Sequence, residues 1–166
     1  MKKVRLTYML SLTFLFALAA GCKKSSAPNP CDDILSEGMP TQVGFIFIDK
    51  QTNENILLSK NIDTSVITIT PLPLDINLSR GVIVKQPGSP MNGALMFTIV
   101  DQKEGTFKYK IDIAGVGSTT LSYTNKKVQT DNKCKAYDIN IADPKIDDHP
   151  FIVTKTGSRL IFKVTL

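Results

Sequence analysis

The segment "TFKYKIDI" (106–113) decides the fold class, because its polar and apolar residues alternate without interruption. The apolar positions are Phe107, Tyr109, Ile111 and Ile113, and the charged positions between them are Lys108, Lys110 and Asp112. Successive side chains of a β-strand point to opposite faces, so this pattern places one face in a core and the other in water. The segment therefore predicts a strand of an antiparallel sheet that is solvated on one side.

The same period of two recurs on both sides of this strand, in 43–48, 65–70, 134–142 and 160–166. The last of these, "LIFKVTL", is expected to be an integral part of a sheet. Its alternate apolar side chains would otherwise form an exposed apolar edge. Shorter apolar runs predict further strands at 56–59, 74–78, 81–85, 94–101, 119–124 and 151–155.

Turn-forming residues separate these segments. Pro71 and Pro73 are expected to interrupt the strand that begins at residue 65, because proline cannot donate to the ladder. The segment "QPGSPMNG" (86–93) has the strongest turn chemistry, with two prolines, two glycines and an asparagine. Further loops are predicted at 49–55, 125–133 and 143–150.

No segment shows a sustained helical period, and turn signals recur at the spacing typical of sandwiches. The sequence therefore predicts an all-β domain over residues 41–166, an antiparallel β-sandwich of seven to nine strands. A closed barrel is the alternative architecture.

The N-terminal segment has the pattern of an export signal. Basic residues near Met1 precede an apolar run from Met9 to Ala20, which is shorter than the roughly 20 apolar residues of a membrane span. The following "LAAGC" (18–22) resembles the lipobox of bacterial lipoproteins, although the third residue before the cysteine is alanine. The resemblance implies a signal peptide over 1–21, lipidation of Cys22 and a tether over 22–40. The alternative is an ordinary signal peptide with an incidental cysteine.

Removal of residues 1–21 would take away three basic residues, and the formal net charge would fall from +5 to +2. The remaining lysines are scattered along the chain. Because nucleic-acid binding requires a clustered basic face, a nucleic-acid partner is not predicted.

Cys31 and Cys134 remain once Cys22 is set aside. An even number of cysteines in an exported chain favours a disulfide, and two free thiols are the alternative. The bridge would join the start of the domain to a late strand and close a loop of about a hundred residues.

The search for chemical groups points to the segment "DPKIDDHP" (143–150). Its single histidine, His149, has no second histidine or free cysteine nearby, so a transition-metal site is not predicted. Asp143, Asp147 and Asp148 are weak candidates for a hard cation, because their spacing does not match an EF-hand loop. We read the segment as a polar turn.

Other catalytic arrangements have little support. The serines lie in turns without a nucleophile elbow, and no phosphate-binding glycine loop is present. The chain has no tryptophan and four tyrosines, which disfavours a glycan-binding cleft. No catalytic residue and no cofactor are predicted.

Four segments together resemble the small uncharacterised lipoproteins of Bacteroidota: "AAGCKK", "VGFIFIDKQTNENIL", read as a hairpin, "CKAYDINI" and "LIFKVTL". The resemblance implies an envelope location and an immunoglobulin-like sandwich, and it supplies no catalytic residue. The lysines after Cys22 lack the acidic run associated with surface export in such proteins. This implies an outer-membrane anchor that faces the periplasm.

We therefore expect a non-enzymatic, lipid-anchored module that binds another envelope protein through loop 86–93 or through a strand edge. The alternative is a lipoprotein of an uptake system that binds a glycan, a lipid or a cation in a pocket. A third and weaker hypothesis is an enzyme that uses Asp147 or Asp148 opposite another acid.

Overall fold

The computed structural model describes Cys31 and residues 39–74 and 80–166. The chain divides into two compact units, Met1–Leu35 and Ser36–Leu166, and the fold described below is that of the second unit. Its elements in chain order are β1 (Gln42–Ile48), α2 (Ile56–Ser59), a 3-10 turn (Thr64–Val66), β2 (Ile67–Leu72), β3 (Val82–Ile83), β4 (Leu95–Thr98), β5 (Gly105–Ile113), β6 (Gly117–Gln129), β7 (Tyr137–Ile146), β8 (Phe151–Thr156) and β9 (Arg159–Thr165).

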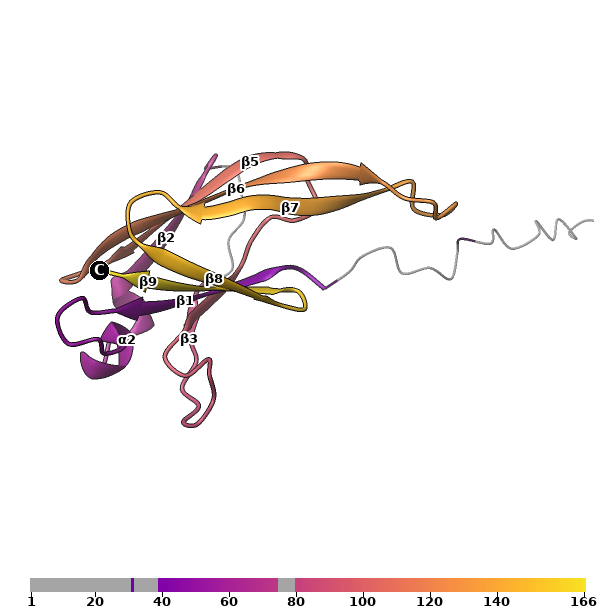
Figure 1. Ribbon diagram of the computed structural model, residues 1–166. Coiled ribbons are helices and arrows are strands. Elements are labelled where there is room, and N and C mark those ends of the chain that lie inside the picture. The colour runs from indigo at the N-terminus through magenta and orange to yellow at the C-terminus, as the bar shows by residue number, and fades with distance from the viewer. Residues whose placement is uncertain (1–30, 32–38, 75–79) are drawn as a thin grey trace, which may run out of the picture. The chain divides into compact units, whose positions relative to one another are not determined.

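These strands form two separate sheets (Figure 1). One has the order β3-β4-β1-β9-β8 and the other the order β2-β5-β6-β7. The neighbours are antiparallel except for β1 and β9, which run parallel with Val43 beside Leu160 and Phe47 beside Val164. The predicted all-β sandwich is therefore confirmed, and the alternative of a closed barrel is wrong. The closing strand β9 lies inside its sheet, as its apolar face predicts.

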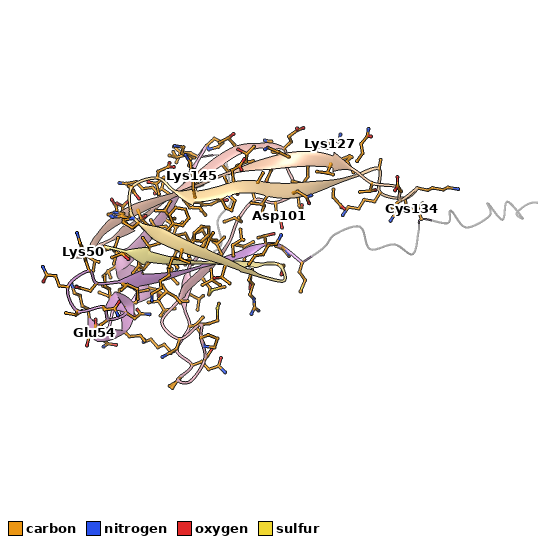
Figure 2. The ribbon with its side chains drawn as sticks, viewed as in Figure 1. Lys50, Glu54, Asp101, Lys127, Cys134 and Lys145 are labelled. Carbon is orange, nitrogen blue, oxygen red and sulfur yellow. The ribbon has the colours of Figure 1, made fainter. Side chains whose placement is uncertain are left out.

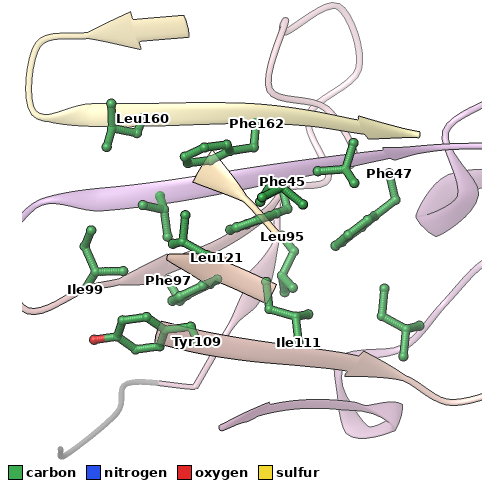
Figure 3. Packing of buried hydrophobic residues seen from close by; sticks show 14 of the residues in the cluster. Phe45, Phe47, Leu95, Phe97, Ile99, Tyr109, Ile111, Leu121, Leu160 and Phe162 are labelled. Carbon is green, nitrogen blue, oxygen red and sulfur yellow. The ribbon is translucent and has the colours of Figure 1, made fainter. Parts of the chain in front are cut away.

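The core lies between the two sheets (Figure 3). Phe45 of β1 is fully buried, and its ring centroid is 5.6 Å from that of Phe97 and 5.2 Å from that of Phe162. The Phe97 ring is in turn 5.7 Å from the ring of Tyr109 on β5, so this contact joins the two layers. The alternation in 106–113 is borne out, since its apolar residues are buried and its lysines are exposed.

The prediction of a strand at 56–59 is wrong, because these residues form the short helix α2. Asn55 caps it: its side-chain Oδ1 accepts hydrogen bonds from the backbone N–H groups of Leu57, at 3.0 Å, and Leu58, at 3.3 Å. An asparagine in this position satisfies donors that a helix start leaves unpaired. After β1 the chain thus forms an isolated antiparallel bridge between Ile48 and Asn55 and then the helix α2. It does not form the second strand of a hairpin.

Of the two prolines expected to interrupt the strand that begins at residue 65, Pro73 does so, because β2 ends at Leu72, whereas Pro71 does not. Strand β2 continues through Pro71, and β7 continues through Pro144. Both are edge strands, where a missing N–H donor removes no ladder bond. Strand β6 also extends to Gln129 into the predicted loop 125–133. In contrast, only Val82–Ile83 of the predicted strand 81–85 is formed. Most of the predicted strand 74–78 lies outside the described residues.

Candidate binding groove at the open edge of the sandwich

A groove lies along the side of the sandwich where β7 and β8 are the edge strands of their sheets. It has two sections, of about 600 and 510 Å³, that share Ile139 and Asn140 of β7. The first section is lined by Met39, Asp101, Gln102 and residues 134–140. The second is lined by Thr41, residues 139–141, Pro144, Val153, Lys155, Gly157, Ser158 and Leu160. We call these residues together the edge groove.

The β7 wall of the edge groove is apolar because of the period of two along the strand. Tyr137, Ile139 and Ile141 share the face that lines the groove, and Val153 and Leu160 line it from the other sheet. Tyr137 is 43% exposed and Val153 is 38% exposed, so both retain apolar area that a bound molecule can cover.

A two-stranded arm carries the outer end of the groove. Residues 126–129 of β6 pair with β7 after β5 has ended, because the last β5 partner is Asn125. The ammonium of Lys127 lies 3.8 Å from the ring centroid of Tyr137, which supports the arm from within. Figure 2 shows Lys127 along this arm and Cys134 at its end.

The loop that forms the groove floor is held by buried side chains that bond to the backbone of Val100. The N–H of Val100 donates to the hydroxyl of Tyr109 at 3.1 Å. The carbonyl of Val100 accepts from the hydroxyl of Tyr123 at 2.8 Å and from the amide of Asn125 at 2.9 Å. That amide also donates to the carbonyl of Lys103 at 2.9 Å. Burial raises the pKa of Tyr123 well above its ordinary value, so the hydroxyl remains a donor.

Asp101 sits within this loop and lines the first section of the groove. Its carboxylate accepts a hydrogen bond from the N–H of Thr41 at 2.6 Å, which ties the loop to the entry of β1. The buried Oδ1 of Asn125 has no hydrogen-bond partner in the described part of the chain. The groove floor is therefore held by several hydrogen bonds within the domain.

The end of the arm carries the predicted disulfide, which is confirmed between Cys31 and Cys134. The turn before β7 is braced locally. The N–H of Cys134 donates to the side chain of Asn132 at 2.9 Å, and the hydroxyl of Thr130 donates to the carbonyl of Lys135. These contacts orient the residues at the outer end of the edge groove.

The candidate carboxylates of segment 143–150 do not line this groove. Of that segment, Pro144 lines its second section. Asp143 has a positive φ of 53° and pairs with Lys126 at 3.3 Å. Asp147 accepts from the hydroxyl of Ser122 at 2.7 Å and from the ammonium of Lys108 at 2.9 Å. The hydroxyl of Ser122, followed by the ammonium of Lys108, lowers the pKa of Asp147.

The neighbouring residues are also engaged in structural contacts. Asp148 accepts from the hydroxyl of Thr119 at 2.8 Å and from the N–H of Thr120 at 3.2 Å. His149 contacts the carbonyl of Ser118 through Nε2 at 3.0 Å. Within Cys31, 39–74 and 80–166, no three His, Cys, Asp or Glu side chains gather in a way that could hold a metal ion.

Loop 86–93, the predicted contact loop, is a structured surface feature. The side chain of Asn92 accepts from the N–H of Gln86 at 3.0 Å, and the carbonyl of Gly93 accepts from the amide of Asn55 at 3.2 Å. The loop is thus tied to the capping residue of α2. Two other hollows exist: about 500 Å³ between β2 and Arg80, and about 540 Å³ beside the β5–β6 turn.

The sequence had identified the apolar face of β7 but not the groove beneath it. Alternation shows which side chains share a face, but it does not show how far the opposite sheet extends. Cys22 lies outside the described residues. In the part of the chain that is described, no helix has the length and apolar character needed to cross a membrane.

Comparison with protein-family models, with curated proteins and with solved structures finds no match to this chain.

Proposed function

We propose that this protein is a lipid-anchored module of the cell envelope that binds an extended segment of another envelope protein in the edge groove. It acts by binding and not by catalysis. The lipobox-like segment that ends at Cys22 supports the anchor, and two lipid chains on that residue hold a soluble domain firmly at a membrane. The lysines that follow Cys22 favour an outer-membrane anchor facing the periplasm.

The observation that carries this proposal is the unpaired edge of β7 beside an open apolar groove. Among the residues that the structure describes, strand β7 pairs only with β6 and ends its sheet. Residues 137–142 form a regular edge, which is interrupted by the positive φ of Asp143 and then by Pro144. Natural proteins usually protect such an edge with proline, charges or a bulge. Here the proline follows residues 137–142, and Asp138, which pairs with Lys135, is the one charged residue among those six.

An extended peptide fits this place for two physical reasons. Its backbone can hydrogen-bond to the free edge of β7 and so add a strand to the four-stranded sheet. Its alternate side chains would then enter the edge groove at a period of two and cover Tyr137 and Val153. A six-residue strand spans about 20 Å, which allows several side chains to be bound in a row.

The groove volume also favours a second candidate, a binding protein for a small ligand. The first section combines an apolar wall with the polar residues Asp101 and Gln102, as small-molecule sites do. A glycan or a lipid of an uptake system would have room there. A cation would find the carboxylate of Asp101.

Site-specific photocrosslinking in living cells tests the first candidate. A photoreactive residue is placed at Asn140, which is exposed and lines both groove sections, and in a control chain at Thr106, which is exposed on the outer face of β5. We expect one reproducible protein adduct from position 140 and none from position 106. Equal adducts from both positions, or none, would contradict a peptide site in the groove. If neither position gives an adduct, changes in melting temperature on addition of glycans and cations test the small-ligand candidate.

A further inference from the structure

The outer face of the five-stranded sheet is apolar where a sandwich normally presents polar side chains to water. The strand register places Val82, Met96, Gly44 and Ile161 side by side across four strands. The next row contains Ile46 of β1, Lys163 of β9 and Ile152 of β8. We call these residues, together with Arg159, the outer band.

The outer band is continuous and its ends are open. Gly44 at its centre leaves room for its neighbours, because a Cβ there would lie 2.6 Å from the sulfur of Met96 and 2.9 Å from Cδ1 of Ile161. These two side chains therefore close over the backbone of β1. At the two edges of the sheet, Val82 is 61% exposed and Ile152 is 68% exposed.

The charges of this face are all of one sign. The five strands contain no aspartate or glutamate, whereas Arg159 and Lys163 point outward from β9. Neither side chain takes part in an ion pair with another described residue. Arg159 donates only to the side chain of Gln42, at 3.2 Å.

The four-stranded sheet is different, because four of its five lysines pair with carboxylates and the fifth, Lys127, lies over the ring of Tyr137. Lys108 pairs with Asp147 at 2.9 Å and Lys110 pairs with Asp112 at 3.0 Å. All ion pairs in the described part of the chain involve lysines between residues 108 and 145. Opposite faces of one small domain thus differ in both hydropathy and charge.

We propose that the outer band rests on an anionic lipid surface and orients the domain on the membrane. Apolar side chains enter the headgroup boundary, and each lysine or arginine near an anionic surface adds about a fivefold gain in affinity. None of the four hollows described above is lined by an outer-band residue. The exposed apolar side chains beside two cations without an ion-pair partner among the described residues have the chemistry that binds an anionic lipid interface.

The length of the N-terminal segment is compatible with this contact. The chain from Cys22 to Cys31 can span at most about 30 Å, and the disulfide attaches Cys31 to Cys134, so a domain anchored at Cys22 stays within reach of the membrane. This argument rests on the lipid anchor proposed above, whereas the charge and hydropathy of the outer band do not. A second copy of this chain is a poor partner for the outer band, because Arg159 and Lys163 of one copy would lie against the same two cationic side chains of the other.

A tryptophan reporter tests the contact in the full chain, which has no tryptophan of its own. Ile152→Trp places the reporter in the outer band, and Val128→Trp is the control on the other sheet, where Val128 is 43% exposed. Each protein is mixed with vesicles of phosphatidylglycerol and phosphatidylcholine in equal parts, and with vesicles of phosphatidylcholine alone. Emission wavelength, acrylamide quenching and co-flotation are recorded.

We expect Ile152→Trp to shift to shorter wavelength and lose acrylamide quenching on the anionic vesicles only, while Val128→Trp remains unchanged. When Arg159→Gln and Lys163→Gln are added to the Ile152→Trp chain, the lipid concentration that gives half of this emission shift should rise roughly thirtyfold. Co-flotation without a shift at residue 152 would overturn the proposed face while supporting the anchor. Equal shifts at both positions, or on both kinds of vesicle, would also overturn it. If the emission at position 152 shifts but the protein does not co-float stably with the vesicles, the result would support the membrane contact of the outer band and contradict the lipid anchor at Cys22.

Discussion

Replacement of Cys134 by serine removes the disulfide to Cys31 and leaves the rest of the chain unchanged. The loop that this bridge closes contains about a hundred residues, from before β1 to beyond the end of β6. Strands of both sheets therefore lie within it. In the unfolded chain, the bridge forbids the large set of conformations in which these two residues are far apart.

The chain-entropy relation assigns about 4–5 kcal/mol of stabilisation to a closed loop of that length. Domains of this size are stable by only about 5–15 kcal/mol, so the loss is a large fraction of the total. We expect Cys134→Ser to lower the free energy of unfolding by this amount. Urea titration followed by far-ultraviolet circular dichroism measures it, because the chain has no tryptophan.

Three matched samples separate the bridge from the side chains. Cys31→Ser, the double variant and the reduced wild-type protein should all show the same loss as Cys134→Ser, because each lacks the same single bond. A loss below about 1 kcal/mol would refute the loop-entropy reasoning. Single losses that add in the double variant would show that the two side chains, and not the bond, carry the effect.

Two further predictions concern single contacts. The pKa of Asp147 is lowered in the folded protein, so its carboxylate stabilises the fold near neutral pH and this stabilisation is lost as the pH falls below about 4. Ser122→Ala should raise the pKa of Asp147 in an NMR titration and move acid unfolding to higher pH. Gly93 has a φ of +76° and an added Cβ would strike the side chain of Asn55, whereas Gly88, with φ of +82°, has open space. Gly93→Ala should therefore lower the melting temperature more than Gly88→Ala, which costs about 1–2 kcal/mol from the backbone alone.

The fold class was predictable because alternation is a local property of a strand. The segment 106–113 and the closing strand each buried the side chains that the period of two selected. The sequence did not predict that β9 would pair in parallel with β1, because that pairing joins distant parts of the chain. The helix α2 was missed because three apolar residues followed by a serine do not distinguish a strand from a single helical turn.

The edges of the sandwich were harder to predict than its centre. Pro71 was expected to interrupt its strand and Pro144 was placed in the predicted loop 143–150, yet both lie in edge strands, where the missing donor has no cost. Whether a strand is at an edge depends on the assembled sheet. For the same reason the edge groove could not be predicted: Tyr137 and Val153 belong to different sheets, and they line the two sections of the groove only when the sheets pack.

The disulfide was predictable from the parity of the cysteines, because an exported chain with two remaining cysteines tends to bridge them. The segment 143–150 was predicted to be a polar turn, but β7 continues to Ile146 and only residues 147–150 lie outside a strand. The contacts of Asp147 with Ser122 and Lys108 were not predictable, since they depend on the strand register.

Hydrogen–deuterium exchange along β7 tests the central claim most directly. A synthetic peptide is made from the segment that the photoreactive residue at position 140 captures, and amide exchange is followed with and without it. The account predicts slower exchange within residues 137–142, where the strand edge is unpaired, and little change in β5. Protection elsewhere on the domain with unchanged exchange in β7 would contradict binding by strand addition at the edge groove.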